Sequence, residues 1–432
     1  NKIDNFTILI RGRKNAFKFR EKITAKIFNL FHDIATIKRF ALVDNAFSRN
    51  RKLTFNNLIL FMLQKSSSAN QRELDDFYRR INGDDFCIRT ITKGAFTQAR
   101  AKLSHEIFME MDYHTRTIFY KDADYYKWGK FRLLVVDGSG CQLPSHPTIE
   151  EEFGSHNFGP NADSKKSMAR ISLLYDPLNC ITLDAQIDAY SVSESALCKR
   201  HLQHIGKGDL VVFDRYYASF DLMDSLFNQK AHFLFRMKDN WWKVVEEFQK
   251  ESTDDKLVQI QTKQGKRTVR LIKYQHKSDG QMIFCTSLVD KKKYTINDIS
   301  NTYAHRWGIE EGYKTFKNWC ELENFSGNTA LAVKQDFYAK IFMMNLGSAY
   351  AHPISDKIKQ EKKGYQLNRV QVIAATKDMP LMLFIRRTVK KAFILFDDIV
   401  SKTIEMIRPN RSFKRKKRPI LKFNPNSSYK SA

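Results

Sequence analysis

Two short, strongly apolar runs near the middle of the sequence each lead to an aspartate. The run FRLLVVDGSG reaches Asp137, where the glycines predict a turn that stops the strand, and GDLVVFDRYYAS reaches Asp214. Apolar runs of this length, bounded by turn residues and rich in Val and Phe, are typical of buried strands. The two runs therefore predict a sheet with a carboxylate at the end of each of two buried strands.

The rest of the central region predicts strands that alternate with helices. ARISLLYDP and CITLDAQIDAY flank a DPLN turn, and the helices ESALCKRHLQHI and SFDLMDSLFNQK lead to the strands GDLVVFD and HFLFRMK. This alternation predicts an α/β fold, and the hairpin makes the sheet mixed. Further along, KLVQIQTKQGKRTVRLIKYQHKSDGQMIFCTSL predicts a three-stranded meander that interrupts the α/β region.

Helices are predicted on both sides of this region, at residues 17–125 and 330–408. The first set carries scattered basic residues, namely Arg79, Arg80, Lys93, Arg100 and Lys102. Short helices with such residues are typical of a small DNA-binding helical domain. An ordinary helical bundle with a solvated basic face fits the same pattern equally well.

The charge of the chain favours a polyanionic partner. Lys and Arg total 73 against 47 Asp and Glu, a formal net charge of +26. Each phosphate that a basic side chain neutralises releases counterions and adds affinity. No apolar run approaches the roughly 18 residues that a membrane-spanning helix needs, so nucleic acid is a better partner than a membrane. The tail RPNRSFKRKKRP is either solvated or a further phosphate or minor-groove contact.

The N-terminal residues and the cysteines predict a cytoplasmic protein, and a nucleic-acid partner would place it on the nucleoid. NKIDNFTILIRGRK has charges where a signal peptide needs an apolar core, and its lack of Met leaves the true start open. The six cysteines show no CxxC pair and no zinc-type spacing, as expected for reduced thiols.

The stretch TYAHRWGIEEGYKTFKNW predicts a helix with one polar stripe. A helix turns by about 100° per residue, which places Tyr303, Arg306, Glu310 and Lys317 within roughly 60° of arc. Lys314 also falls near this stripe, so geometry alone leaves it as an alternative to Lys317. A solvated face with ion pairs is the ordinary interpretation of such charges.

A metal site that lies beside bound phosphates is the more specific interpretation of the same residues. Asp137, Asp214 and Glu310 supply the hard oxygen ligands that Mg²⁺ prefers. Two such ions about 4 Å apart could activate a water or a 3′-hydroxyl for in-line attack on phosphorus. Arg306 and Lys317 would then bind phosphate oxygens, and Tyr303 could hydrogen-bond or stack nearby.

These residues resemble the signature of DDE transposases of bacterial insertion sequences, in the cut-and-paste group that carries Y-x2-R-x3-E-x6-K. The blocks VVDGSGCQLP, GDLVVFDRYYAS, FLFRMK and RWGIEEGYKTFK resemble the family's blocks in order, over roughly residues 50–420. The resemblance implies a ribonuclease-H-like mixed-sheet catalytic core with a β-strand insertion. It also implies that Asp137, Asp214 and Glu310 bind Mg²⁺, with Mn²⁺ as a possible substitute, and carry the catalysis.

The resemblance further implies a domain order and a reaction. The expected domains are an N-terminal helical DNA-binding domain at 1–125, a catalytic core at 126–240 and 289–350, a β insertion at 241–288, and a C-terminal helical region with a basic tail at 351–432. The expected enzyme binds the inverted repeats at transposon ends and cleaves them through a hairpin. It then joins the 3′ ends to target DNA, as a homodimer in a synaptic complex on double-stranded DNA.

Further DNA-binding candidates lie around the second Asp and the β insertion. Trp241 and Trp242 are candidates for stacking on a flipped base, although a core position fits either as well. Arg215 and Arg236 could contact phosphate or form simple ion pairs. Two rival functions stay open: a transposase-derived DNA-binding protein without strand transfer, and a ribonuclease-H-like nuclease that hydrolyses without joining.

Overall fold

The computed structural model describes residues 17–49, 51–64, 68–157, 165–238, 242–276 and 280–407. Contacts divide the chain into two compact units, and the divisions fall after Ala123 and after Lys314. Within the described residues, no helix is both long enough and apolar enough to cross a membrane. The domain boundaries expected from the sequence stay a prediction, and the basic tail after residue 407 lies outside the described residues.

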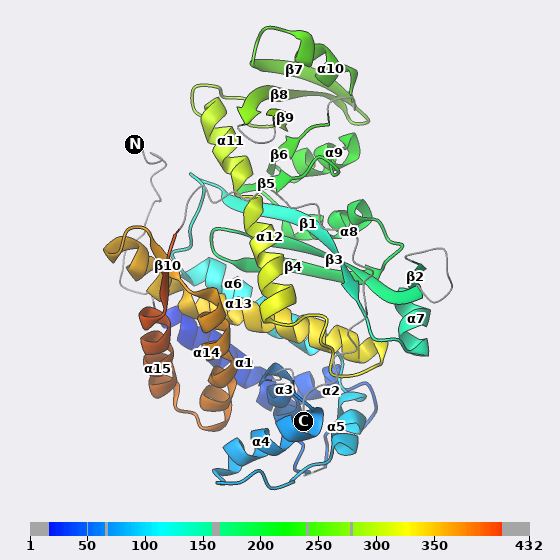
Figure 1. Cartoon of the computed structure of the whole chain (residues 1–432), viewed down its shortest axis with the longest axis vertical. Coiled ribbons are helices and arrows are strands. Elements are labelled where there is room, and N and C mark those ends of the chain that lie inside the picture. The colour runs from blue at the N-terminus through cyan, green and yellow to red at the C-terminus, as the bar shows by residue number, and fades with distance from the viewer. Residues whose placement is uncertain are drawn as a thin grey trace. The chain divides into compact units, whose positions relative to one another are not determined.

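The unit that contains Asp124–Lys314 is built on one mixed sheet (Figure 1). Its strands are β1 (Arg132–Gln142), β2 (Ser155–Asn157), β3 (Lys165–Asp176), β4 (Ile181–Ala189), β5 (Asp209–Phe213), β6 (His232–Arg236), β7 (Asp255–Thr262), β8 (Gly265–His276) and β9 (Gly280–Thr286). Along the sheet the order is β2-β3-β1-β5-β6-β9-β8-β7, and β4 also pairs with β3.

The central part of this sheet confirms the predicted fold class. β3 is antiparallel to both of its neighbours β4 and β1, whereas β1, β5 and β6 run parallel. Three antiparallel strands followed by two parallel ones is the ribonuclease-H-like arrangement. The parallel strands are buried on both faces, as their continuous apolar runs predict. The three meander strands are also present, and β9 pairs with β6, so they extend the same sheet.

The first Asp strand differs from its prediction. β1 does not stop at Asp137 but continues to Gln142, and each of its residues from Val135 onward pairs with β3. Gly138 and Gly140 permit a turn but do not require one, and here both lie in regular strand pairing. Cross-strand pairing therefore overrides the local turn signal, and Asp137 lies within a strand. β5, in contrast, ends at Phe213, directly before Asp214, as predicted.

Helices connect these strands. They are α7 (Pro147–Phe153), α8 (Glu194–His201), the short 3-10 helix η3 (Leu202–His204), α9 (Phe220–Asn228), α10 (Lys243–Lys250), α11 (Ile296–Ala304) and α12 (Trp307–Lys314). Ser193 and Ser219 cap α8 and α9 through their hydroxyls, and α11 begins with a capping box from Thr295 and Asp298. α10 lies beside the strands of the meander (Figure 1).

The other unit is helical. It contains α1 (Lys18–His32), α2 (Ile34–Phe40), α3 (Phe55–Gln64), α4 (Asn70–Asn82), α5 (Lys93–Arg100), α6 (Glu106–Asp122), the π-helical turn η4 (Thr315–Trp319), α13 (Ala330–Glu361), α14 (Arg369–Pro380), the π-helical turn η5 (Leu381–Ile385) and α15 (Val389–Lys402). The strands β10 (Tyr365–Leu367) and β11 (Ile404–Met406) form a small antiparallel pair. The predicted N- and C-terminal helical regions thus pack into one unit, with α13 against α6.

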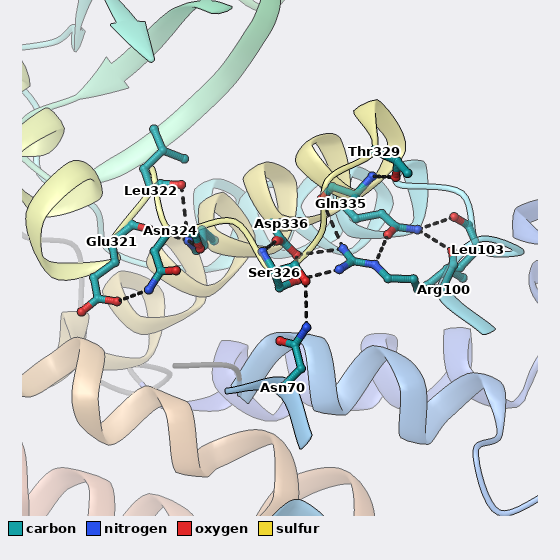
Figure 2. A network of polar contacts seen from close by, with 12 residues as sticks. Asn70, Arg100, Leu103, Glu321, Leu322, Asn324, Ser326, Thr329, Gln335 and Asp336 are labelled. Carbon is teal, nitrogen blue, oxygen red and sulfur yellow. Dashed lines mark hydrogen bonds and ion pairs between the residues drawn. The ribbon is translucent and has the colours of Figure 1, made fainter. Parts of the chain in front are cut away.

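A buried arginine joins these two helical regions. Figure 2 shows the guanidinium of Arg100, at the end of α5, between side chains of α13 and of the segment before it. It donates to Asp336 at 3.0 Å, to Gln335 at 3.0 Å and to the Ser326 hydroxyl at 2.6 Å. Arg100 is 4% exposed. It therefore belongs to the core of this unit and not to the basic DNA-binding face that the sequence suggested.

Candidate active site

The helix predicted over residues 302–319 is not continuous. α11 ends at Ala304, and the next two N–H groups, of His305 and Arg306, donate to carbonyls only three residues back. α12 then begins at Trp307 and passes into the wider π-helical turn η4. A constant step of 100° per residue does not hold through such changes of winding. The backbone therefore sets the direction of each polar side chain separately.

Two glycines bring α12 close to the β3–β4 hairpin. A Cβ atom on Gly308 would lie 2.5 Å from Cβ of Pro177, and one on Gly312 would lie 3.3 Å from the ring of Tyr175. Gly308 has no room for a side chain, and Gly312 has room for one only if the ring of Tyr175 shifts. The small and apolar side of the predicted helix thus packs against the sheet, and Glu310 between the two glycines is fixed relative to it.

Substituting Gly308 should therefore destabilise the fold. Gly308→Ala forces its methyl group into the rigid ring of Pro177, and overpacking of this kind costs about 1–3 kcal/mol. The free energy of unfolding, measured by urea denaturation, checks this value. Gly206→Ala is the matched control, because a Cβ there meets nothing within 4 Å. Equal stability of the two variants would contradict the close packing of α12.

Arg306 is the common partner of the three predicted acids. Its Nη2 atom donates to Oε1 of Glu310 at 2.9 Å. It also interacts electrostatically with Asp137 and with Asp214, and these two carboxylates repel each other. Arg306 therefore hydrogen-bonds to Glu310, on α12, and lies within electrostatic range of Asp137, in β1, and of Asp214, after β5.

The environment of Asp137 is unfavourable for a negative charge. Burial raises the pKa of its carboxyl to about 6, and the nearby Glu194 and Asp214 add to the rise. A hydrogen bond from the N–H of Gly138 and the charge of Arg306 act in the opposite direction without cancelling it. A carboxylate held in this way gains from an additional positive charge close by.

Glu194 is a site residue that the sequence interpretation missed. It is the first residue of α8, and its side chain passes directly over Gly138, where a Cβ would lie 2.6 Å from Cγ of Glu194. Arg170 donates to Oε1 of Glu194 at 2.8 Å, and the Tyr217 hydroxyl lies 3.5 Å from Oε2. An acid in the first turn of the helix after the β3–β4 hairpin was a visible signal, but such acids are common at helix starts.

Arg306 has a hydrogen-bond donor without an acceptor among the described residues. This donor is its Nε atom, which is buried. The guanidinium lies 5.9 Å from the ring centre of Tyr303 and 5.6 Å from that of Trp307. Tyr303 itself is buried, and burial raises the pKa of its hydroxyl to about 12, with the positive charges of Arg306 and Arg236 opposing the rise. An unsatisfied N–H donor on a cation suits a phosphate oxygen.

The other predicted DNA-binding residues are distributed differently. Arg215 is exposed and its guanidinium lies 5.4 Å from the ring centre of Tyr216, while Arg236 ends β6. Lys314 is exposed and lies 3.5 Å from Glu311, and Lys317 is part of η4 in the helical unit. Trp242 is 8% exposed and stacks on Phe220 at 4.3 Å between ring centres. Trp241 lies outside the described residues.

The donor chemistry of the site fits a divalent cation. Within the described ranges, no group of three His, Cys, Asp or Glu side chains is already arranged to hold a metal ion. Glu310 accepts its hydrogen bond from Arg306 instead. However, burial is the main cause of the raised pKa of Asp137, with Glu194 and Asp214 adding to it, and a bound cation would offset both effects. Carboxylate oxygens are also the hard ligands that Mg²⁺ or Mn²⁺ prefers.

Two known proteins are similar to this chain in sequence. In Escherichia coli strain K12, the transposase InsG for insertion sequence element IS4 is 21% identical over 294 residues, 65% of this chain and 65% of that protein. The putative transposase InsZ of the same strain is 25% identical over 190 residues, 42% of this chain and 60% of that protein. The matches thus span less than two thirds of the length of either relative.

A solved structure and a family model add to these relatives. The cryo-EM structure of the piggyBac transposase synaptic complex with hairpin DNA is similar over 87% of this chain and 85% of that chain, with 12% identity and a TM-score of 0.47. The model of the family described as transposase DDE domain matches residues 128–346, slightly more than half of the chain. The chain belongs to the transposase DDE domain family.

Proposed function

We propose that this chain is a DNA transposase that binds the inverted repeats at the ends of its element, cleaves the DNA there and joins the 3′ ends to target DNA. The observation that carries the proposal is the position of Arg306, which hydrogen-bonds to Glu310 and interacts electrostatically with Asp137 and Asp214. Membership of the family and two relatives named as transposases support the same reaction. The net charge of +26 supports DNA as the partner.

Each side chain has a proposed task in this reaction. Asp137, Asp214 and Glu310 would hold divalent cations, two Mg²⁺ ions or Mn²⁺ in their place, which supply Lewis-acid activation of water and phosphate when bound. Arg306 would bind a phosphate oxygen through its guanidinium. Tyr303, Arg236 and Lys317 would position the strand beside it.

The remaining steps follow from the signature that the chain carries. We infer a hairpin intermediate at the transposon end and a homodimer that assembles the two ends in a synaptic complex. Arg215, exposed after Asp214, is a further candidate for contact with the DNA backbone. The substrate would place the protein on the nucleoid in the cytoplasm. The N-terminal helices at 1–125 would read the inverted repeats.

A strand-transfer assay tests the proposal directly. The full chain is mixed with a labelled duplex that carries the inverted repeat found beside the gene, a supercoiled target plasmid and Mg²⁺. We expect a joined product. Nicking without joining would instead indicate a ribonuclease-H-like nuclease, and binding without cleavage would indicate a DNA-binding protein. Both of these outcomes contradict the proposed transposase.

Hairpin formation and hairpin resolution should depend on Lys317 more than first-strand nicking does. We expect Lys317→Ala to slow hairpin formation or resolution by roughly tenfold, equivalent to about 1.4 kcal/mol, and first-strand nicking by less, because the lysine would hold the displaced end. Rates of each step on a gel check this expectation. Lys314→Ala tests the alternative to Lys317, and we expect a smaller effect from it because Lys314 is exposed and lies 3.5 Å from Glu311. A uniform loss at every step by Lys317→Ala would point to misfolding.

A further inference from the structure

A chain of buried polar side chains leads to the main chain of Asp137. Nδ1 of His201 lies 2.7 Å from Oδ2 of Asp184, and Nε2 of His201 lies 2.9 Å from the hydroxyl of Ser172. The Ser172 hydroxyl lies 3.3 Å from the carbonyl oxygen of Asp137, to which it donates. These residues come from β4, α8, β3 and β1, so the chain crosses four elements of one unit.

The order Asp, His and Ser is also found in enzymes that use serine as a nucleophile, but burial excludes that use here. Ser172 and His201 are both 0% exposed, so no substrate reaches the hydroxyl. The carboxylate of Asp184 only accepts hydrogen bonds, which assigns a hydrogen to Nδ1 of His201 and fixes the ring. The Ser172 hydroxyl has a single hydrogen, which it donates to the carbonyl oxygen of Asp137, so Nε2 of His201 must donate to Oγ of Ser172. Both ring nitrogens of His201 then carry a hydrogen, and the carboxylate of Asp184 balances the charge.

The acceptor at the end of this chain is shared. The hydroxyl of Tyr313, on α12, donates to the same carbonyl oxygen of Asp137 at 2.7 Å. The next residue, Gly138, has no side chain to pack, and glycine within a strand weakens it. Two side-chain donors therefore hold the main chain at the point where β1 is intrinsically least constrained. A shift of about 1 Å at such a point can cost about a hundredfold in rate.

We propose that Ser172 and His201 are positioning residues, which hold the carboxylate of Asp137 in place by fixing its main-chain carbonyl. This inference rests on the proposed function, because the position of Asp137 matters only if that residue holds the catalytic cation. Asp184 orients His201, and Tyr313 anchors the same carbonyl from the helix that carries Glu310. The chain thus links the first acid to both the sheet and α12.

The test compares two buried serines on the same strand. Ser172→Ala should lower the rate of DNA-end cleavage by about 10- to 100-fold, the usual effect of removing a hydrogen-bond partner behind a metal ligand, while the Kd for the DNA end stays unchanged. Ser167→Ala is the control, because the Ser167 hydroxyl is buried but has no hydrogen-bond partner among the described residues. Ser172→Thr, which keeps the hydroxyl, should recover most of the rate.

Two readouts do not depend on cleavage. The Ser172→Ala protein should bind Mn²⁺ about tenfold more weakly, measured by electron paramagnetic resonance. Its β1 peptide, residues 133–142, should exchange amide hydrogens faster than in Ser167→Ala. If the two alanine variants agree in cleavage rate, Mn²⁺ affinity and exchange, the positioning role is wrong. A wild-type protein that never cleaves contradicts the proposed function instead, and the exchange comparison still tests the positioning.

Discussion

Glu310→Gln is expected to lower the rate of DNA-end cleavage by about a thousandfold, which corresponds to roughly 4 kcal/mol of transition-state stabilisation. The amide keeps the size of the side chain and can still accept a hydrogen bond from Arg306, so the fold should be retained. It removes the negative charge that a divalent cation requires from its ligand. Cleavage in Mg²⁺, with the Kd for the DNA end measured in parallel, tests this expectation.

Glu311→Gln provides the matched control for this variant. Glu311 is the next residue on α12, is 60% exposed and lies 3.5 Å from Lys314. An exposed pair of this kind contributes little, so the variant should keep most of its activity. Near-normal cleavage by Glu310→Gln would reject Glu310 as a ligand. Equal losses in both variants would mean that the charge of the helix matters and not the position of one carboxylate.

Arg100→Ala is expected to lower the free energy of unfolding of the helical unit by about 3–5 kcal/mol. The substitution leaves Asp336 buried without its cation, since the two side chains are 5% and 7% exposed. It also removes the donors that reach Gln335 and Ser326. Denaturation followed by far-ultraviolet circular dichroism is the suitable measurement, because this unit is helical.

Two further variants show how much of the expected loss of stability comes from burial and how much from the charge of Arg100. Lys402→Ala breaks an exposed ion pair with Asp398 at 2.7 Å and should cost less than about 1 kcal/mol. Arg100→Lys keeps the charge but lacks the planar set of donors, so its loss should lie between the two. A cost for Arg100→Ala as small as that for Lys402→Ala would show that the network in Figure 2 does not hold the helical regions together.

The sequence predicted the parts of this protein that depend on local pattern. The apolar runs that lead to Asp137 and Asp214 are buried strands in the structure, and the turn between β7 and β8 falls in the predicted KQGK segment. The mixed sheet follows from the alternation of strands and helices, and is confirmed. The resemblance to DDE transposases of bacterial insertion sequences is confirmed by the family match and by two relatives. The roles of the individual site residues stay predictions.

Tertiary structure decided which side chains meet. The pairing of Asp137 with Leu173 continues β1 past its glycines and sets Ser172 beside the Asp137 carbonyl, and no local pattern contains that register. Burial likewise decided that Arg100 is a core residue and that Trp242 stacks on Phe220. The periodicity of a sequence indicates which face of a helix or strand is apolar. Contacts between segments that are far apart in sequence depend on strand register and side-chain packing, which only the folded chain defines.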